Sequence, residues 1–392
     1  MVIRWGTSAW LGSLAVGAIL AATVTFAGVE DRADAGRALP APTLSTPPTS
    51  SPRPTTTTTT APPDPCGAVA AGMSSRARLA QLVMVGVDPR GADDAVDQVR
   101  AEQIGGIFIG GDAVGLLSGG ALGSVHATAS LPLTVAVDDE GGRVQRVDQL
   151  DGELPSAREM VARYSPDEVR ALAHKRGAAL RARGVTMDLA PVVDTSDQPG
   201  RTVIGDRSFS PDPRVATAYA LAFSDGLRAA GVAPVLKHFP GHGNTTGDSH
   251  LGSVRSPALD ALRGTDLVPY RSLPEFGDVT VMVGHIDVPG LTDGRPASVS
   301  PAAYALLRGE FAFAGPVMTD DLGAMRAVTD LYDLPDAVLH ALAAGADVAL
   351  WSSGGRTGEV LTRLENAVAS GELPQARVDE ALRRVLHAKQ VC

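Results

Sequence analysis

Short apolar segments alternate with helix-forming segments eight times from about residue 67 to the end of the chain. The apolar segments are rich in β-branched residues, and the segments between them carry Ala, Leu and Arg at helical spacing. Helices are expected at Pro211–Gly231, Pro301–Phe313 and Pro374–Gln390, among others. The predicted strands occupy residues 82–88, 105–111, 133–140, 185–194, 233–241, 279–288, 315–323 and 346–354.

Eight strand-then-helix units predict a single (β/α)8 TIM barrel, an α/β fold. A doubly wound open sheet is the alternative, because periodicity alone does not separate the two, but the count of eight favours the barrel. Polar residues end six of the predicted strands, at Asp88, Asp138, Asp194, Lys237-His238, His285-Asp287 and Asp320-Asp321. In a barrel these positions meet at the C-terminal mouth, where such enzymes place their sites, although capping of strand ends would explain a few of them.

The first 29 residues differ from the rest of the chain. Arg4 is followed by an almost uncharged apolar run that ends at Ala27, which is typical of a signal peptide or an uncleaved membrane anchor. Thr25-Phe26-Ala27 offers a small-x-small cleavage pattern, and no cysteine follows it, which disfavours a lipoprotein anchor. Either outcome predicts an exported protein, secreted or associated with the cell envelope, that contacts a membrane only through this segment.

Residues 30–65 are dominated by Pro and Thr, which favours an extended, disordered linker before a folded domain at 66–392. The two cysteines of the chain, Cys66 and Cys392, stand at the two ends of that domain. In an exported protein this placement predicts a disulfide that joins the ends, and two free thiols are the alternative.

Composition disfavours two classes of partner. A net charge of −10 without a basic tract disfavours binding to nucleic acid. An aromatic content of 4% disfavours a long groove that stacks against a polymer.

The stretch KHFPGHGNTTGDSH, residues 237–250, concentrates reactive side chains. His238, His242, Asp248 and His250 could supply metal ligands, as in metal-dependent amide hydrolases built on the same barrel. Those enzymes usually carry a His-x-His pair on an early strand, and the first four predicted strands contain none. A metal site is therefore disfavoured, and no cofactor is expected.

The same stretch suits acid–base chemistry. Asp248 and His250 are two residues apart, so the carboxylate can orient an imidazole that moves protons. A carboxylate of MTDDLGAM, residues 318–325, could act as a nucleophile. Neighbours on a strand point to opposite faces, so we expect one of Asp320 and Asp321 to enter the mouth and the other to pack outside. The residues alone do not choose between them.

Four stretches together carry a resemblance: DDEGGRVQR (138–146), IGDRSFSPDP (204–213), KHFPGHGNTTGDSH (237–250) and MTDDLGAM (318–325). The chain resembles glycoside hydrolase family 3, specifically its single-domain bacterial β-N-acetylglucosaminidases. The resemblance covers residues 67–392 and implies the (β/α)8 barrel. It also implies exo-acting cleavage with retention, without a metal or cofactor, of terminal N-acetylglucosamine from cell-wall (peptidoglycan) fragments.

The resemblance implies a role for each matching residue. Asp320 matches the nucleophile, His250 the acid/base and Asp248 its partner. The residues that match positions holding the sugar are Asp138, Arg146, Arg207, Lys237 and His238. The second residue of DDEGG, Asp139, has no role in this pattern. A structural ion pair with Asp206 or Glu140 is the alternative role for the arginines.

Other expectations concern neighbouring residues and other functions. His242 is expected to pack or hydrogen-bond within its turn, His285 to be a satisfied structural group, and Phe239–Pro240 to be cis. Glycines and threonines around Asp248 and His250 predict a mobile loop. A phosphorylase on the same scaffold and a sugar-binding protein without activity are alternative functions, and the protein is expected to be a monomer.

Overall fold

Eight parallel strands form the centre of the structure, a computed structural model that describes residues 65–392. Each of them falls inside one of the predicted segments. Their bounds are β1 (Val83–Gly86), β2 (Gly106–Ile109), β3 (Thr134–Val137), β4 (Met187–Asp188), β5 (Ala233–Phe239), β7 (Thr280–Val283), β9 (Val317–Thr319) and β10 (Ala349–Trp351). The predicted leader at 1–29 and nearly all of the linker at 30–65 lie outside the described residues.

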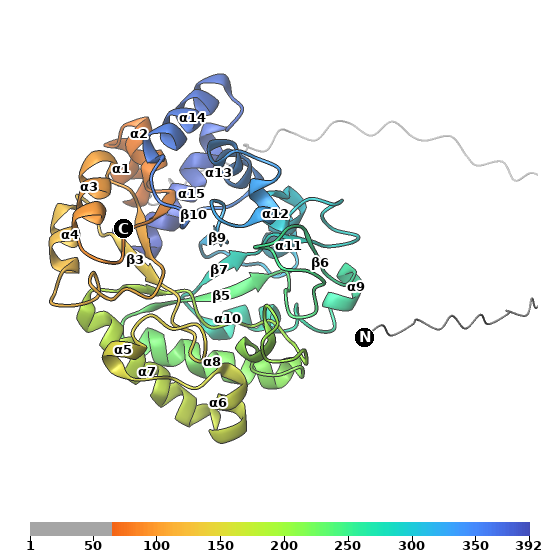
Figure 1. Cartoon of the computed structure of the whole chain (residues 1–392). Coiled ribbons are helices and arrows are strands. Elements are labelled where there is room, and N and C mark those ends of the chain that lie inside the picture. The colour runs from red at the N-terminus through yellow and green to blue at the C-terminus, as the bar shows by residue number, and fades with distance from the viewer. Residues whose placement is uncertain (1–64) are drawn as a thin grey trace, which may run out of the picture. The chain divides into compact units, whose positions relative to one another are not determined.

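The strands pair in the order β10-β1-β2-β3-β4-β5-β7-β9. A parallel bridge between Met318 and Val348 connects the two ends of this order and completes the ring. Helices surround the ring on its outer side, as Figure 1 shows. The (β/α)8 barrel is therefore confirmed, and the open sheet is excluded.

The helices lie in the connections between strands. The longer ones are α3 (Asp93–Glu102), α7 (Pro166–Arg183), α8 (Pro213–Ala229), α11 (Pro301–Gly309), α13 (Leu334–Ala344), α14 (Thr357–Ser370) and α15 (Gln375–Ala388). The shorter α-helices are α1 (Pro65–Ala71), α2 (Ser75–Ala80), α4 (Leu122–Thr128), α5 (Asp148–Asp151), α6 (Ala157–Arg163), α9 (Leu259–Leu262), α10 (Leu273–Phe276) and α12 (Arg326–Thr329). Short 3₁₀ turns lie at Gly205–Arg207, Pro269–Ser272 and Ala297–Val299, and a two-stranded parallel sheet pairs β6 (Val254–Arg255) with β8 (Ile286–Asp287).

Local sequence sets the helix limits. Helix α7 begins at a capping box: the Ser165 hydroxyl accepts from the backbone N–H of Glu168, and the Glu168 carboxylate accepts from the backbone N–H of Ser165, with Pro166 in the first turn. It ends at Gly184, whose φ of 99° is a left-handed conformation that favours glycine. Among residues 65–392, no helix is long and apolar enough to cross a membrane.

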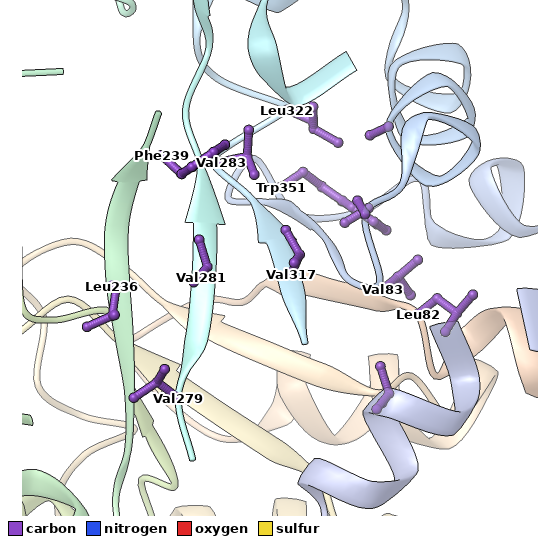
Figure 2. Packing of buried hydrophobic residues seen from close by; sticks show 14 of the residues in the cluster. Leu82, Val83, Leu236, Phe239, Val279, Val281, Val283, Val317, Leu322 and Trp351 are labelled. Carbon is purple, nitrogen blue, oxygen red and sulfur yellow. The ribbon is translucent and has the colours of Figure 1, made fainter. Parts of the chain in front are cut away.

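Alternation along the strands separates two apolar layers. Val281 and Val283 of β7 and Val317 of β9 belong to a buried cluster that they share with residues of the surrounding helices. Figure 2 shows these three side chains on neighbouring strands. The residues between them, Met282 and Met318, belong to a separate cluster inside the barrel. That inner cluster also contains Met84, Phe108, Ala136, Leu189, Val235 and Leu350. The barrel is therefore packed through its middle, which closes it to passage from end to end.

The ends of the described chain meet at the N-terminal face of the barrel. Cys66 and Cys392 form a disulfide with Cα atoms 5.1 Å apart, across a sequence separation of 326 residues, so the predicted pairing is confirmed. Cys392 lines a cavity of about 920 Å³ together with first residues of strands such as Thr134 and Thr280. The disulfide is therefore at the end of the barrel opposite the C-terminal mouth.

Candidate active site

A cavity of about 630 Å³ opens at the C-terminal ends of the strands. Apolar residues of the inner barrel cluster, Phe108, Leu189, Met282 and Leu350, also line this cavity. All eight residues that were singled out for chemistry line it: Asp138, Arg146, Arg207, Lys237, His238, Asp248, His250 and Asp320. The structure thus brings together side chains from the ends of β3, β5 and β9 and from three loops.

Lys237 is the centre of a buried charged cluster. It is 2% exposed, and its Nζ lies 2.6 Å from Asp138 Oδ1 and 2.6 Å from Glu140 Oε1. Burial lowers the pKa of Lys237, but the two carboxylates outweigh burial and hold that pKa above its ordinary value. The ammonium group has three N–H donors, so one remains for a ligand.

Arg207 and Glu140 form a two-fold ion pair beside Lys237. Arg207 donates from Nε to Glu140 Oε2 and from Nη2 to Glu140 Oε1, each at 2.7 Å. Burial raises the pKa of Glu140, but Arg207 and Lys237 outweigh it and hold that carboxyl ionised, well below its usual pKa. The alternative of an ion pair with Glu140 is therefore realised for Arg207, inside the cavity.

Glu140 is a pocket residue that the sequence analysis treated only as a possible partner of the arginines. Its position directly after Asp138 and Asp139 is the signal that could have identified it, because the three residues follow the end of β3. Asp138 keeps Oδ2 without a partner among the described residues, and Arg146 keeps a buried Nε without one. These two groups are therefore available to a ligand.

Asp139 was expected to have no role, and this expectation is wrong for the structure. Its carboxylate is fully buried and accepts hydrogen bonds from the backbone N–H groups of Arg146 at 2.9 Å and Val147 at 3.2 Å. Arg176 of α7 pairs with it at 3.2 Å. Asp139 therefore holds the turn that carries Arg146 into the cavity.

Asp320 and Asp321 follow β9 and differ in how their carboxylates are used. Asp321 accepts from the backbone N–H groups of Gly323 and Ser352, both at 2.9 Å, and from the Ser352 hydroxyl. Asp320 is 8% exposed, and within residues 65–392 its carboxylate accepts only from the backbone N–H of Asp321 at 2.9 Å. Burial opposes ionisation of Asp320, but His238 and His285 outweigh burial and lower its pKa. Asp320 therefore has the free, ionised carboxylate.

The expected packing of one of these aspartates outside the mouth is wrong, because both line the cavity. The reason is that β9 ends at Thr319. Strict alternation of side chains holds only within a strand, and these two residues lie in the turn beyond it.

His238 and His242 are held by different partners. His238 Nδ1 lies 2.7 Å from Asp194 Oδ2. His242 Nδ1 lies 2.8 Å from the hydroxyl of Thr245, as expected for a residue that hydrogen-bonds within its turn. Burial, followed by the proximity of His238, lowers the pKa of His242 to about 4, so its ring is neutral near pH 7.

His285 is a satisfied structural group, as expected. Its ring nitrogens lie 2.7 Å from the Ser298 hydroxyl and 2.8 Å from the Asp321 carbonyl oxygen. The Phe239–Pro240 bond is cis, also as expected. Within residues 65–392, no group of three or more His, Cys, Asp or Glu side chains is arranged to hold a metal ion.

Asp248 and His250 lie on a loop at the rim. Asp248 Oδ1 is 2.9 Å from His250 Nδ1 and accepts from the His250 backbone N–H at 2.9 Å. Burial raises the pKa of Asp248, but these two bonds outweigh it and the pKa is lowered. Ser249, between them, is buried, and its carbonyl oxygen accepts from the N–H of Ala327 at 3.0 Å. The loop is therefore attached to the segment that follows Asp320.

Residues 74–388 match the Glycosyl hydrolase family 3 N terminal domain, which spans nearly all of the described chain. The chain belongs to glycosyl hydrolase family 3. As a member of glycosyl hydrolase family 3 it is an enzyme, a glycoside hydrolase built on a (β/α)8 barrel. The (β/α)8 fold that the resemblance implied is thereby confirmed together with the family.

Curated relatives and solved structures are similar to this chain. "Beta-hexosaminidase LpqI" of Mycobacterium tuberculosis is 51% identical over 333 residues, which cover 83% of this chain and 85% of the relative. The solved structure "M tuberculosis LpqI" has a TM-score of 0.80 at 50% identity and covers 83% of this chain and 96% of its own. A β-N-acetylhexosaminidase structure from Beutenbergia cavernae has a TM-score of 0.74 at 30% identity, with 82% of this chain and 99% of its own covered.

Proposed function

We propose that this chain is an exo-acting, retaining β-N-acetylglucosaminidase. One observation carries the proposal: the ionised, otherwise unused carboxylate of Asp320 shares a cavity with a separate carboxylate–imidazole pair, Asp248 and His250. Retaining glycoside cleavage needs a nucleophile and an acid/base around one bond. The printed names of the relatives, β-hexosaminidase and β-N-acetylhexosaminidase, support the choice of sugar.

In the first step, an oxygen of Asp320 attacks the anomeric carbon of the terminal sugar. The bond between that carbon and the leaving oxygen breaks, and His250 gives its proton to the leaving oxygen. Asp248 stabilises the imidazolium form of His250 before that transfer, because its carboxylate accepts from Nδ1. The products of this step are a free aglycone and a glycosyl ester on Asp320.

In the second step, a water molecule attacks the same carbon, and His250, now without its extra proton, accepts a proton from that water. The bond from carbon to Asp320 breaks and the carboxylate is regenerated. Two displacements at one carbon return the original configuration, so the released sugar is the β-anomer.

The charged cluster holds the sugar during both steps. Asp138 Oδ2 can accept from a hydroxyl, while the third N–H of Lys237 and the guanidinium groups of Arg146 and Arg207 can donate to sugar oxygens. His238 contacts the sugar from the side of Asp320. The apolar cluster below closes the cavity, which favours binding of a chain end and therefore exo-action.

The substrates that we propose are N-acetylglucosamine-capped peptidoglycan fragments, acted on outside the cytoplasm by an exported, monomeric enzyme. The disulfide between Cys66 and Cys392 supports export, because structural disulfides persist in oxidising compartments. Intact-mass measurement on the protein from its native host would show whether residues 1–29 are removed or retained.

A phosphorylase is the second candidate, since a histidine acid/base does not repel an incoming phosphate anion as a carboxylate would. The test uses the purified protein and 4-nitrophenyl N-acetyl-β-glucosaminide, with and without phosphate and with and without a chelator. We expect release of the free β-anomer of N-acetylglucosamine, seen by NMR at early times, at a rate that neither additive changes. The sugar 1-phosphate as product would identify a phosphorylase, and loss of activity with chelator would identify a metal-dependent hydrolase. No turnover at all would identify a sugar-binding protein.

A further inference from the structure

Asp194 is a buried carboxylate that accepts hydrogen bonds from one short stretch of chain. It is 1% exposed and lies beyond β4, at the C-terminal end of the barrel. Its Oδ1 accepts from the backbone N–H of His242 at 2.8 Å, and its Oδ2 accepts from the backbone N–H of His238 at 3.2 Å. Oδ2 also lies 2.7 Å from Nδ1 of the His238 ring.

The last of these contacts determines which ring nitrogen carries hydrogen. Burial raises the pKa of Asp194, but His238 outweighs burial and the pKa is lowered, so Asp194 is an ionised carboxylate. An ionised carboxylate only accepts hydrogen bonds. The hydrogen between the two groups therefore belongs to Nδ1 of His238.

The opposite nitrogen of the ring, Nε2, remains for a ligand. His238 lines the cavity, and Nε2 has no hydrogen-bond partner in the described part of the chain. In a neutral ring with hydrogen on Nδ1, Nε2 carries a lone pair and accepts from a hydroxyl. A ring with the hydrogen on Nε2 would present a donor in the same place.

We propose that Asp194 is a positioning residue that fixes the orientation and the tautomer of His238, so that Nε2 accepts a hydrogen bond from a hydroxyl of the bound sugar. The inference rests on the proposed function only for the identity of that sugar. A second carboxylate–imidazole pair thus serves binding, while the pair of Asp248 and His250 serves proton transfer.

The substitution Asp194→Asn tests the tautomer directly. With its oxygen in place of Oδ1, asparagine keeps the bonds from the backbone N–H groups of His242 at 2.8 Å and His238 at 3.3 Å, loses the His238 N–H bond to Oδ2, and places an NH₂ group against Nδ1 of His238. A donor at that point forces a neutral ring to carry its hydrogen on Nε2 instead. The shape of the site changes little, because the two side chains have the same size.

Asp266 offers a matched control. It is also fully buried, and its Oδ1 accepts from the backbone N–H of Thr195 at 3.0 Å and of Gly243 at 3.2 Å. Thr195 and Gly243 are direct sequence neighbours of Asp194 and His242, but Asp266 has no hydrogen bond to a histidine ring in residues 65–392. If both aspartates had a purely structural role, Asp194→Asn and Asp266→Asn would have the same effect on the tautomer of His238.

The tautomer is measured by long-range ¹H–¹⁵N correlation spectra of the imidazole nitrogens, without substrate. The signals of His238 are identified as those that are missing from the spectrum of His238→Asn. In the wild-type protein we expect hydrogen on Nδ1 of His238. Asp194→Asn should move it to Nε2 and Asp266→Asn should not. Wild-type protein whose His238 carries hydrogen on Nε2, alone or together with Nδ1, would overturn the inference, even if no variant folds.

Kinetics provide the second arm. Asp194→Asn should lower kcat/KM by roughly 10- to 100-fold, because a sugar hydroxyl then faces the wrong partner. In a His238→Asn background the same change should have no further effect. Additive losses in the double variant would overturn the inference. If the tautomer behaves as expected and the protein cleaves no N-acetylglucosaminide, the proposed function fails and the positioning role stands.

Discussion

Asp248 and His250 form a 2.9 Å carboxylate–imidazole contact on a loop that leaves the side chain of His250 60% exposed. The proposed proton donor thus lies at the rim, while the proposed nucleophile, Asp320, is buried. In the proposed mechanism the two groups act on opposite sides of one bond, so it requires the loop to place His250 over the bound sugar. The requirement for His250 should therefore depend on how much help the leaving group needs.

His250→Ala should be severely slowed on a disaccharide, where an alcohol departs and must take up a proton. The first step on an aryl glycoside should be affected less, since a nitrophenolate departs unaided. The second step still needs a base, so the glycosyl-enzyme should accumulate. Intact-mass spectrometry should show one added N-acetylglucosaminyl group, mapped to the peptide with Asp320. Full activity on the disaccharide would contradict the role of His250.

Asp320→Asn should lose activity by about 1,000-fold or more on every substrate, because no glycosyl ester can form. Asp321→Asn is the matched control. Its remaining oxygen can still accept from the N–H groups of Gly323 and Ser352, and its NH₂ group can donate to the Ser352 hydroxyl. We expect this control to keep activity within about tenfold. A larger loss of activity in Asp321→Asn than in Asp320→Asn would indicate that Asp321 is the nucleophile.

Asp138→Ala should raise the activation free energy that corresponds to kcat/KM by on the order of 3 kcal/mol, because hydrogen bonds to a charged group are stronger than those between neutral groups. Lys237 should stay in place in this variant, because Glu140 still pairs with it at 2.6 Å. Asp206→Ala is the control. It removes a partly exposed ion pair with Arg143 and should raise the same activation free energy by about 1 kcal/mol or less. Steady-state kinetics on both variants decide the point, and a loss below tenfold would remove Asp138 from the sugar site.

Replacement of both Cys66 and Cys392 by Ser should lower the free energy of unfolding. Closure of so long a loop contributes on the order of 5 kcal/mol in the chain-entropy model. Activity at low temperature should be retained, since the disulfide is remote from the cavity. Urea titrations of wild-type and variant protein measure the difference. Equal midpoints, or two free thiols by mass in the wild-type protein, would contradict the expectation.

Stability should depend on pH through Asp266. Burial, and then the charge of Asp194, raises the pKa of Asp266 to about 6, against about 3.9 in an unfolded chain. The folded state holds the proton more tightly, so this contribution to stability is complete below the unfolded pKa and is lost as pH rises through about 6. Asp266→Asn, which stays neutral, should lack this decline between about pH 4 and pH 7. Denaturation at several pH values compares the two, and parallel curves would assign the carboxyl an ordinary pKa.

The eight strands could be predicted from the sequence because each is a local apolar run, and polar residues at the ends of six of them indicated the C-terminal mouth. The strands themselves are shorter than predicted: β4 is only Met187–Asp188, because Pro191 has no N–H with which to continue a ladder. The chemistry of the cavity was predictable where residues cluster in short stretches, as Asp248 and His250 do.

Partnerships between distant segments could not be predicted. Asp194 and His238 are 44 residues apart, and Glu140 and Arg207 are 67 apart. Nothing in the local pattern distinguishes Asp194 from the other aspartates that end strands. Such pairs depend on which strand ends become neighbours and on the distance between the side chains. Periodicity predicts the neighbouring strands but not the distances.

The disulfide at the N-terminal face fixes the point at which the chain enters the barrel. Pro65, where the described chain begins, is next to Cys66 and therefore at the end of the barrel away from the catalytic mouth. The chain therefore enters the barrel at its N-terminal face. Because the Cys66–Cys392 crosslink joins α1 to the segment that follows α15, a force applied at Pro65 is shared between the first and the last helix of the barrel.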